Sequence, residues 1–180
     1  MGKKNSFSLD VVSVRLVKDA PVFSEFEIHS PEDAIRVVGD VLSQMDREIV
    51  CVLNLKANGI PINCNFASVG ALNYSMAHPR ELLKASILSN AANIILVHNH
   101  PASSLLPSRE DIRVTDRMQK LCDLVGIPLL DHVIVGGDNS RYFSFKEKGI
   151  IKQPVINYCD DYRQLQWNRD VTVAEKGKQR

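Results

Sequence analysis

Apolar residues recur first at helical and then at strand-like spacing from residue 30 onward. Ser30-Pro31 predicts a helix start, because serine can cap a helix and proline suits the first helical position. Helical spacing then places four apolar residues on one face, namely Ile35, Val38, Leu42 and Met45. Residues 48–55 follow as a strand that is buried after its first residue. Asn58-Gly59 predicts a hairpin turn to a return strand that begins at residues 60–62.

A second helix and a third strand are expected between residues 79 and 97. Pro79 opens the helix, again as a first helical residue. Its apolar stripe comprises Leu83, Ile87 and Leu88, flanked by Leu82 and Ala91. The strand over residues 93–97 carries an apolar run of the kind found inside a sheet that is covered on both faces. A loop over residues 98–107 follows this strand.

A third helix is expected to begin at Ser108 and to end at Gly126, since glycine commonly follows the last helical residue. One side of this helix comprises Ile112, Thr115, Met118, Leu121, Cys122 and Val125. Strands over residues 129–135 and 141–145 complete the pattern. Helices thus alternate with mostly short strands, which predicts an α/β fold. The sheet should be mixed, because the hairpin adds an antiparallel pair.

The pattern is weaker at both ends of the chain. Residues 1–29 are interpreted as an N-terminal extension, in which residues 11–17 could form an edge strand or an arm. Periodicity fades beyond residue 151, so residues 152–180 are expected to form a loosely packed tail. In that tail, Trp167 could dock on the domain or contact a partner. The expected organisation is one domain over residues 30–151 with an extension at each end.

Composition narrows the class of protein. Hydrophobic residues make up 44% and charged residues 24% of the chain, as in ordinary soluble domains. The formal net charge is +1, so the basic excess of a non-specific nucleic-acid binder is missing. The four cysteines include no C-x-x-C pair, which argues against a cysteine-rich zinc site. With no apolar stretch long enough to cross a bilayer, we expect a reduced, cytoplasmic protein without a membrane partner.

Two histidines after the third strand carry the most informative pattern. His98 and His100 lie two residues apart, so an extended backbone points both to one side, roughly 6.6 Å apart along the chain. Asp111 lies on the first turn of the next helix, which a returning loop brings over the strand end. Two imidazoles, one carboxylate and an open fourth position are typical of a catalytic zinc ion. The sequence therefore predicts one Zn²⁺ held by these three residues.

Glu48 and Ser108 are the candidate catalytic side chains. Zinc lowers the pKa of bound water toward about 7, but a base must still pass the proton to the leaving group. Glu48 is the candidate base, since a charged residue that opens an apolar strand calls for an explanation. Ser108 could hydrogen-bond the oxyanion as the attacked carbonyl becomes tetrahedral.

Each of these side chains also has a simpler structural interpretation. Ser108-x-x-Asp111 is a helix-capping pattern, as is Ser30-x-x-Asp33, which has no histidine pair nearby. Glu48 could be a solvated residue at a strand start. His98 and His100 could be loop residues bonded to backbone groups, although their spacing favours metal ligation. Capping and chemistry can coexist, so both interpretations of Ser108 stay open.

The remaining histidines have no ligand-like spacing. Asp131-His132 is interpreted as structural, with support of the metal ligands or a place in a substrate cleft as alternatives. His29 and His78 are interpreted as ordinary exposed or core residues.

The ordered set of residues is recognisable. Glu48, then His98-x-His100, then Ser108-x-x-Asp111 after seven residues resembles the JAMM motif of the JAB/MPN metalloprotease superfamily. From Ser30 to Ile151 the chain is similar to the RadC-like branch of that superfamily. The strings that carry this similarity are Gly70-Ala71-Leu72, His78-Pro79-Arg80-Glu81, His98-Asn99-His100-Pro101, Pro107-Ser108-Arg109-Glu110-Asp111 and Asp131-His132-Val133-Ile134-Val135.

The resemblance implies a three-layer fold like that of cytidine deaminases, one zinc ion, and hydrolysis of peptide or isopeptide bonds in a peptide or protein substrate. It assigns His98, His100 and Asp111 as zinc ligands. It assigns Glu48 as the acid/base and Ser108 as the oxyanion helper.

Two departures from the family pattern affect these expectations. Ala102-Ser103 stands where RadC-like sequences usually have Ser-Gly, which alters the loop beside the metal because glycine permits backbone angles that serine resists. The helix-hairpin-helix region that often precedes this domain in longer relatives is not recognised here. RadC-like proteins are commonly labelled as DNA repair proteins, so a non-catalytic or DNA-associated module is the alternative function. The near-neutral charge gives it no support.

Overall fold

The computed structural model describes residues 13, 15–19, 21–69, 78–102, 104–136 and 139–152. Within these ranges the chain forms three helices and five strands. In chain order they are α1 (Pro31–Ser43), β1 (Ile49–Leu55), β2 (Pro61–Val69), α2 (Pro79–Leu88), β3 (Asn93–Asn99), α3 (Arg109–Val125), β4 (Leu129–Val135) and β5 (Tyr142–Ser144).

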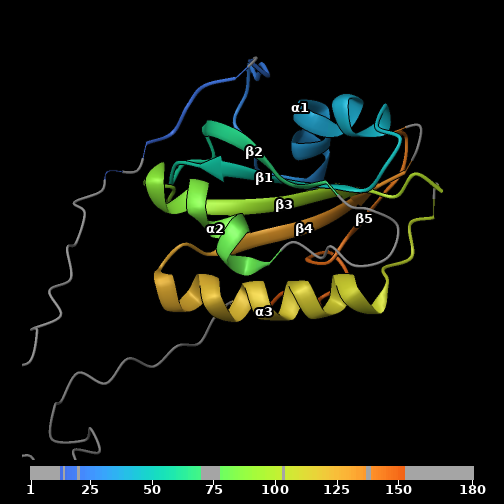
Figure 1. Ribbon diagram of the computed structural model, residues 1–180. Helices are drawn as coiled ribbons and strands as arrows, with labels where there is room; N and C mark the ends of the chain where they lie inside the picture. Colours follow the sequence, from blue (N-terminus) through green and yellow to red (C-terminus); the bar gives the residue numbers. More distant parts are fainter. Residues whose placement is uncertain are drawn as a thin grey trace, which may run out of the picture.

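The strands form one mixed sheet in the order β2-β1-β3-β4-β5. β1 lies antiparallel to both β2 and β3, β3 lies parallel to β4, and β4 lies antiparallel to β5. Figure 1 shows α1 on one face of the sheet and α3 on the other. The core contacts of α2 place it on the α3 side. The pattern of the sequence predicts this α/β arrangement with a mixed sheet, and the family resemblance implies its three layers; the architecture is consistent with a JAB/MPN-like fold.

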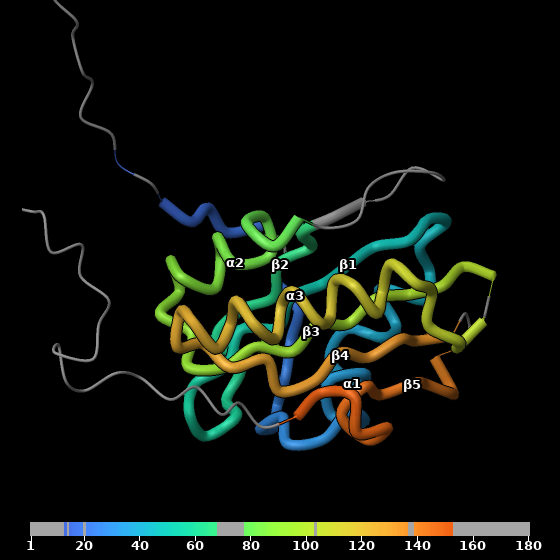
Figure 2. Tube along the Cα trace, turned by 90° about the horizontal axis from the view of Figure 1, so that it is seen from below, coloured from blue at the N-terminus to red at the C-terminus, as the bar shows by residue number. Residues whose placement is uncertain are grey.

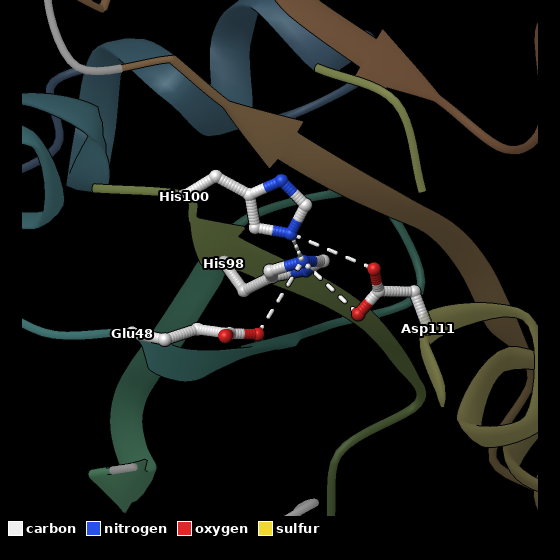
Figure 3. A group of neighbouring side chains, drawn as sticks. All are labelled: Glu48, His98, His100 and Asp111. Atoms are coloured by element: carbon white, nitrogen blue, oxygen red, sulfur yellow. Dashed lines mark hydrogen bonds and ion pairs between the residues drawn. The ribbon is translucent and has the colours of Figure 1, made fainter. Parts of the chain in front are cut away.

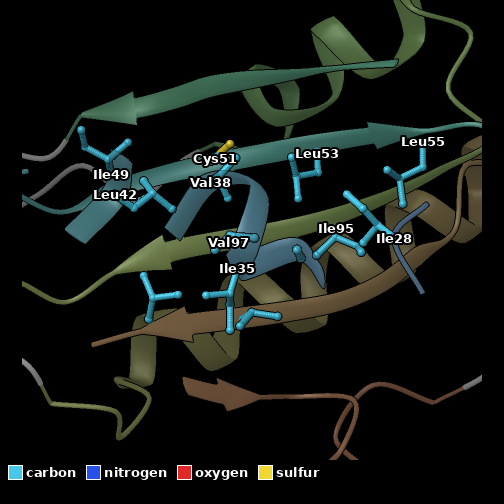
Figure 4. Packing of buried hydrophobic residues seen from close by; sticks show 13 residues of the cluster. Ile28, Ile35, Val38, Leu42, Ile49, Cys51, Leu53, Leu55, Ile95 and Val97 are labelled. Carbon is cyan, nitrogen blue, oxygen red and sulfur yellow. The ribbon is translucent and has the colours of Figure 1, made fainter. Parts of the chain in front are cut away.

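The two faces of the sheet carry separate apolar cores, because successive strand residues point to opposite faces. Leu53 on β1 packs toward α1, whereas the adjacent Val52 packs toward α2 and α3. Figure 4 shows Ile35 and Val38 of α1 among residues from β1 and β3. The central strands are therefore buried on both faces, as their apolar composition predicts.

The helix and turn signals of the sequence act as predicted. Ser30 caps α1 through a capping box, in which its hydroxyl accepts from the Asp33 N–H at 3.2 Å and its own N–H donates to the Asp33 carboxylate at 3.1 Å. Gly59 turns the β1–β2 hairpin with a φ of +83°. Gly126 ends α3 in the left-handed conformation with a φ of +71°.

β3, α3 and β4 form a parallel crossover unit. α3 runs along the sheet, and Figures 1 and 2 both show its axis close to the direction of the strands. Because β3 and β4 are parallel, the helix must return along the sheet between them. The carboxyl end of β3 and the first turn of α3 consequently lie at the same edge, where α/β proteins commonly bind ligands.

Two expectations about single elements are wrong. β3 continues to Asn99 instead of ending at residue 97, since His98 and Asn99 still pair with Ile134 and Val135 of β4. The apolar stripes of α2 and α3 are also narrower than predicted. Of the residues assigned to them, Ile87, Leu88, Ile112 and Val125 are 53%, 41%, 47% and 45% exposed. Leu83 and the flanking Leu82 of α2 are buried as expected, as are Thr115, Met118 and Cys122 of α3, and α3 also buries Val114.

Several expectations concern residues outside the described ranges. These are the loop at Gly70-Ala71-Leu72-Asn73, the tail beyond residue 152 with Trp167, and residues 11, 12 and 14 of the proposed N-terminal strand. Residues 15–19, which belong to the described part, are exposed and outside any strand. No helix among the described residues has the length and apolar character needed to span a bilayer.

Candidate metal centre

Four side chains with metal-binding groups meet at the edge where β3 ends and α3 begins. They are Glu48, His98, His100 and Asp111, and one ligand atom from each lies within 4.8 Å of those of the others. Figure 3 shows the two imidazoles, the Asp111 carboxylate and the Glu48 carboxylate pointing toward one another. The structure thus brings together the three residues that the sequence assigns to the metal and the one that it assigns as a base.

The distances within the cluster are short. His98 Nε2 lies 3.0 Å from His100 Nε2 and 3.3 Å from Asp111 Oδ1. His100 Nε2 lies 3.5 Å from Asp111 Oδ2. Glu48 Oε1 stands farther off, at 3.9 Å from His98 Nε2. Nitrogen and oxygen atoms of three residues therefore face one another closely, and Glu48 lies at the margin.

Exposure separates Glu48 from the other three residues. The side chains of His98, Asp111 and His100 are 1%, 5% and 14% exposed, whereas that of Glu48 is 47% exposed. The cluster is closed on the side of the three buried groups and open to solvent at Glu48. A group that exchanges protons with water needs such a position.

The sheet places the two histidines. His98 lies opposite Val50 of β1 and Ile134 of β4, so its backbone is held from both sides. The His100 N–H donates to the Val135 carbonyl at 3.2 Å, which continues the pairing with β4 past the end of β3. His100 Nδ1 lies 2.7 Å from the Ser104 carbonyl. Since a carbonyl only accepts, Nδ1 carries a proton, and in the neutral ring Nε2 presents a lone pair to the cluster.

A capping box places Asp111. Its carboxylate Oδ2 accepts from the Ser108 N–H at 2.6 Å, and its own N–H donates to Ser108 Oγ at 3.1 Å. Ser108 is therefore a helix cap, as the simpler interpretation predicts. The cap also orients Asp111 so that Oδ1 faces His98. Ser108 Oγ accepts from this backbone N–H, and a hydrogen bond between the Ser108 side chain and the Asp111 carboxylate also lowers the pKa of that carboxyl.

The electrostatics of the cluster favour a cation. Burial alone would raise the pKa of Asp111, but the contacts with the His100 and His98 rings and a hydrogen bond with Ser108 outweigh it and hold the pKa of this carboxyl well below its usual range. The contact with Asp111 likewise raises the pKa of His100, against the opposing effect of burial. The site therefore holds an ionised carboxylate beside two imidazole nitrogens.

This donor set fits a divalent metal ion. Two imidazole nitrogens and one carboxylate oxygen, from two buried residues and the partly buried His100, match the ligand types that zinc prefers. The cluster could hold a metal ion. Ala102, where the loop departs from the usual family pattern, lies in an exposed turn after His100, and Ser103 lies outside the described residues.

Two buried residues that support the cluster were not assigned to the site from the sequence. His132 of β4 places its Nε2 at 2.8 Å from His98 Nδ1, and its ring stacks on Phe145 at a centroid distance of 4.8 Å. Asn99 bonds to the backbone on both sides of Glu48. A polar side chain in the middle of an otherwise apolar strand was the available signal for His132.

Asp131, the neighbour of His132, has a structural role. Its carboxylate accepts from the Ser144 hydroxyl at 2.6 Å and from the Lys146 N–H at 2.9 Å, and so fixes the chain that leaves β5. The structural interpretation of the Asp131-His132 pair thus fits Asp131, whereas His132 contacts a member of the cluster.

Known proteins are similar to this chain over most of its length. The model of the RadC-like JAB domain family matches residues 28–150. A UPF0758 protein of Clostridium beijerinckii is 37% identical over 128 residues, which cover 71% of this chain and 55% of the relative. A UPF0758 protein of Caldanaerobacter subterraneus is 43% identical over 124 residues, covering 69% and 52%. The chain spans about half the length of the curated relatives that it matches, and these matches confirm the resemblance that the residue strings indicate.

Proposed function

This chain belongs to the RadC-like JAB domain family, and on that premise we propose that it is a zinc-dependent hydrolase of peptide or isopeptide bonds. The observation that carries the proposal is the convergence of His98 Nε2, His100 Nε2 and the Asp111 carboxylate on one point, with Glu48 at the open side. The site thus combines largely buried side chains that can hold a metal ion with a solvent-accessible carboxylate that can transfer a proton. Metal-assisted hydrolysis requires both.

His98, His100 and Asp111 would hold the ion. Two nitrogens and one carboxylate oxygen leave a fourth position open, as in catalytic zinc sites. When bound, zinc would supply Lewis acidity toward the scissile carbonyl and would lower the pKa of water toward about 7. Among the described residues, protein covers the cluster on the side of His98 and Asp111. Substrate would therefore approach from the side of Glu48, which is exposed.

Glu48 acts as the general base and acid. Its carboxylate is half-exposed and lies 3.9 Å from His98 Nε2, which is too long for a hydrogen bond and leaves it free to bond to water. It takes a proton from the attacking water and returns it to the leaving amine nitrogen. Such a positioned proton carrier typically contributes a factor of about 10²–10⁴ to the rate.

Ser108 stabilises the oxyanion. Its oxygen accepts from the Asp111 N–H, and its hydroxyl, which also contacts the Asp111 carboxylate, would turn its proton toward the substrate oxygen. The hydroxyl thereby serves both the helix cap and the tetrahedral oxygen that forms when the carbonyl is attacked. This joint role retains both interpretations that the sequence left open.

Turnover of peptide substrates by the zinc-loaded protein tests this function. A fluorescence-quenched peptide library and isopeptide-linked peptides are incubated with the wild-type protein, Glu48→Gln and Glu110→Gln. Glu110 is an exposed acid on the first turn of α3 that pairs with Arg113 and serves as the matched control. We expect Glu48→Gln to bind zinc but to lose at least about 100-fold in turnover, with Glu110→Gln unchanged.

Two results would contradict the proposal. Equal turnover by the wild-type protein and Glu48→Gln would show that the cleavage does not come from this site. If the zinc-loaded wild-type protein cleaves neither substrate class, the ion stabilises the loop between β3 and α3 and is not catalytic.

A further inference from the structure

A buried chain of hydrogen bonds connects the Asp111 backbone to the His98 ring. Thr115 Oγ1 lies 2.6 Å from the Asp111 carbonyl oxygen and 2.6 Å from His132 Nδ1. His132 Nε2 lies 2.8 Å from His98 Nδ1. Thr115, His132 and His98 are each 1% exposed. The chain runs through α3, β4 and β3 and joins two of the residues in the metal cluster.

The chemistry of these groups fixes the direction of every bond. A carbonyl oxygen only accepts, so the single proton of the Thr115 hydroxyl goes to Asp111. Thr115 Oγ1 must then accept from His132 Nδ1–H. A neutral imidazole carries one proton, so His132 Nε2 accepts in turn, and its donor is His98 Nδ1–H. His98 therefore carries its proton on Nδ1 and presents a lone pair at Nε2.

This proton placement bears on the contact between His98 Nε2 and His100 Nε2. At 3.0 Å the two nitrogens are close enough for a hydrogen bond. His100 also holds a proton on Nδ1, which donates to the Ser104 carbonyl. With both rings neutral, two lone pairs and the Asp111 carboxylate face one point. Such a group of electron-pair donors suits a cation.

We propose that Thr115 and His132 are positioning residues that hold the His98 proton on Nδ1 and so prepare Nε2 as a metal ligand before the ion arrives. The link to metal binding rests on the proposed function, whereas the placement of the proton is a property of the metal-free protein. His132 also stacks on Phe145 with ring planes 11° apart, and this contact fixes the orientation of the His132 ring. Partners of this kind orient a ligand and raise its basicity.

Histidine tautomers in the metal-free full chain provide the first test. Long-range proton–nitrogen NMR correlations distinguish Nδ1–H from Nε2–H in each ring. At mildly alkaline pH we expect His98 and His132 of the wild-type protein to be the Nδ1–H tautomers. A proton on His98 Nε2 in the metal-free wild-type protein would overturn the proposed positioning of His98, whether or not the protein binds zinc. The expected tautomers in a protein that binds no zinc would support the positioning of His98 and reject the proposed function.

Zinc affinity of Thr115 variants provides the second test. Thr115→Val keeps the shape of the side chain but removes the acceptor for His132, and we expect zinc affinity to fall by about 10–100-fold. Thr115→Ser restores the hydroxyl and should recover the wild-type affinity. Ser86→Ala is the matched control, because Ser86 is a fully buried hydroxyl on α2 that donates to the Leu82 carbonyl.

Measurements of thermal unfolding in chelator separate positioning from stability. If Thr115 has a purely structural role, Thr115→Val and Ser86→Ala should both lower the unfolding midpoint of the metal-free protein. Both variants should then keep the zinc affinity of the wild-type protein. An affinity loss in Thr115→Val alone supports the proposal. Wild-type affinity in Thr115→Val, with the wild-type tautomer of His98 retained, would overturn it.

Discussion

Asn99 accepts a hydrogen bond at its Oδ1 from the Ile49 backbone N–H at 2.8 Å, across the pair of strands β3 and β1. The Nδ2 of the same amide donates to the Arg47 carbonyl at 3.0 Å. Asn99 thus binds the backbone on both sides of Glu48, from the position between His98 and His100. Because Asn99 is only 2% exposed, water cannot replace these bonds. One side chain therefore couples the position of the proposed base to that of the proposed ligands.

Replacement of Asn99 should separate turnover from metal binding. Asn99→Ala leaves two backbone groups without their partner, so we expect a loss of about 1–3 kcal/mol in the free energy of unfolding. Displacement of Glu48 should lower turnover by at least about 10-fold, with a smaller change in zinc affinity. Asn54→Ala, which removes another buried asparagine of the sheet, is the control for stability. Wild-type turnover in Asn99→Ala would refute the coupling.

Ser108 and Ser30 occupy the same capping position on two helices, and only Ser108 lies beside the cluster. Each alanine variant should lose about 0.5–2 kcal/mol of stability, measured by denaturant unfolding. Turnover should fall by about 10²–10³ in Ser108→Ala, as for loss of an oxyanion donor, and stay unchanged in Ser30→Ala. Equal turnover in the two variants would leave Ser108 with the role of a cap alone.

Gly59 is required for two separate reasons, and Gly149 serves as its control. Both have a positive φ, so alanine should cost about 1–2 kcal/mol of folding free energy at either position. At Gly59 an added Cβ would also lie 2.8 Å from the Ile28 carbonyl oxygen, whereas nothing lies within 4 Å at Gly149. We therefore expect Gly59→Ala to be the less stable variant in urea unfolding. Equal losses would show that the contact with Ile28 relaxes freely.

The ligand set could be predicted from the sequence because it depends on local geometry. The spacing of His98 and His100 along a strand and the capping position of Asp111 place all three at the edge of one crossover unit. Contacts that depend on register between distant strands could not be predicted in this way. The link from His98 to His132 requires the parallel pairing of β3 with β4 and the irregularity between Ile94 and Ile95.

The end of β3 illustrates a second limit of hydrophobic patterning. His98 and Asn99 are polar, and the apolar run stops at Val97, so the pattern ends the strand too early. Backbone pairing with β4 nevertheless continues to Asn99, and both polar side chains are buried in hydrogen bonds. Polar residues of a functional site can be buried because they are hydrogen-bonded there, and a hydropathy pattern does not show this.

Cys64 and Cys51 provide a test of pH dependence away from the cluster. A hydrogen bond from the Cys51 thiol lowers the pKa of Cys64 to about 7, against the opposing effect of burial. Below this pKa Cys64 is a thiol, so its alkylation by iodoacetamide should accelerate as the pH rises through about 7. Cys51→Ala removes the donor while Cys64 stays partly buried, so the midpoint should rise to about 8.5 or above, whereas Cys51→Ser should leave it unchanged. Peptide-resolved mass spectrometry measures the rate, and an unchanged midpoint in Cys51→Ala would contradict the assignment.

Calorimetric titration of the metal-free protein with Zn²⁺ tests the central claim most directly. Asp111→Ala is compared with Asp33→Ala, because Asp33 holds the same capping-box position on α1 without a histidine pair. We predict one zinc ion per wild-type chain, unchanged binding in Asp33→Ala, and a loss of at least about 100-fold in Asp111→Ala, beyond that of a supporting residue. A wild-type chain that binds no zinc, or equal affinities in the two variants, would contradict the account.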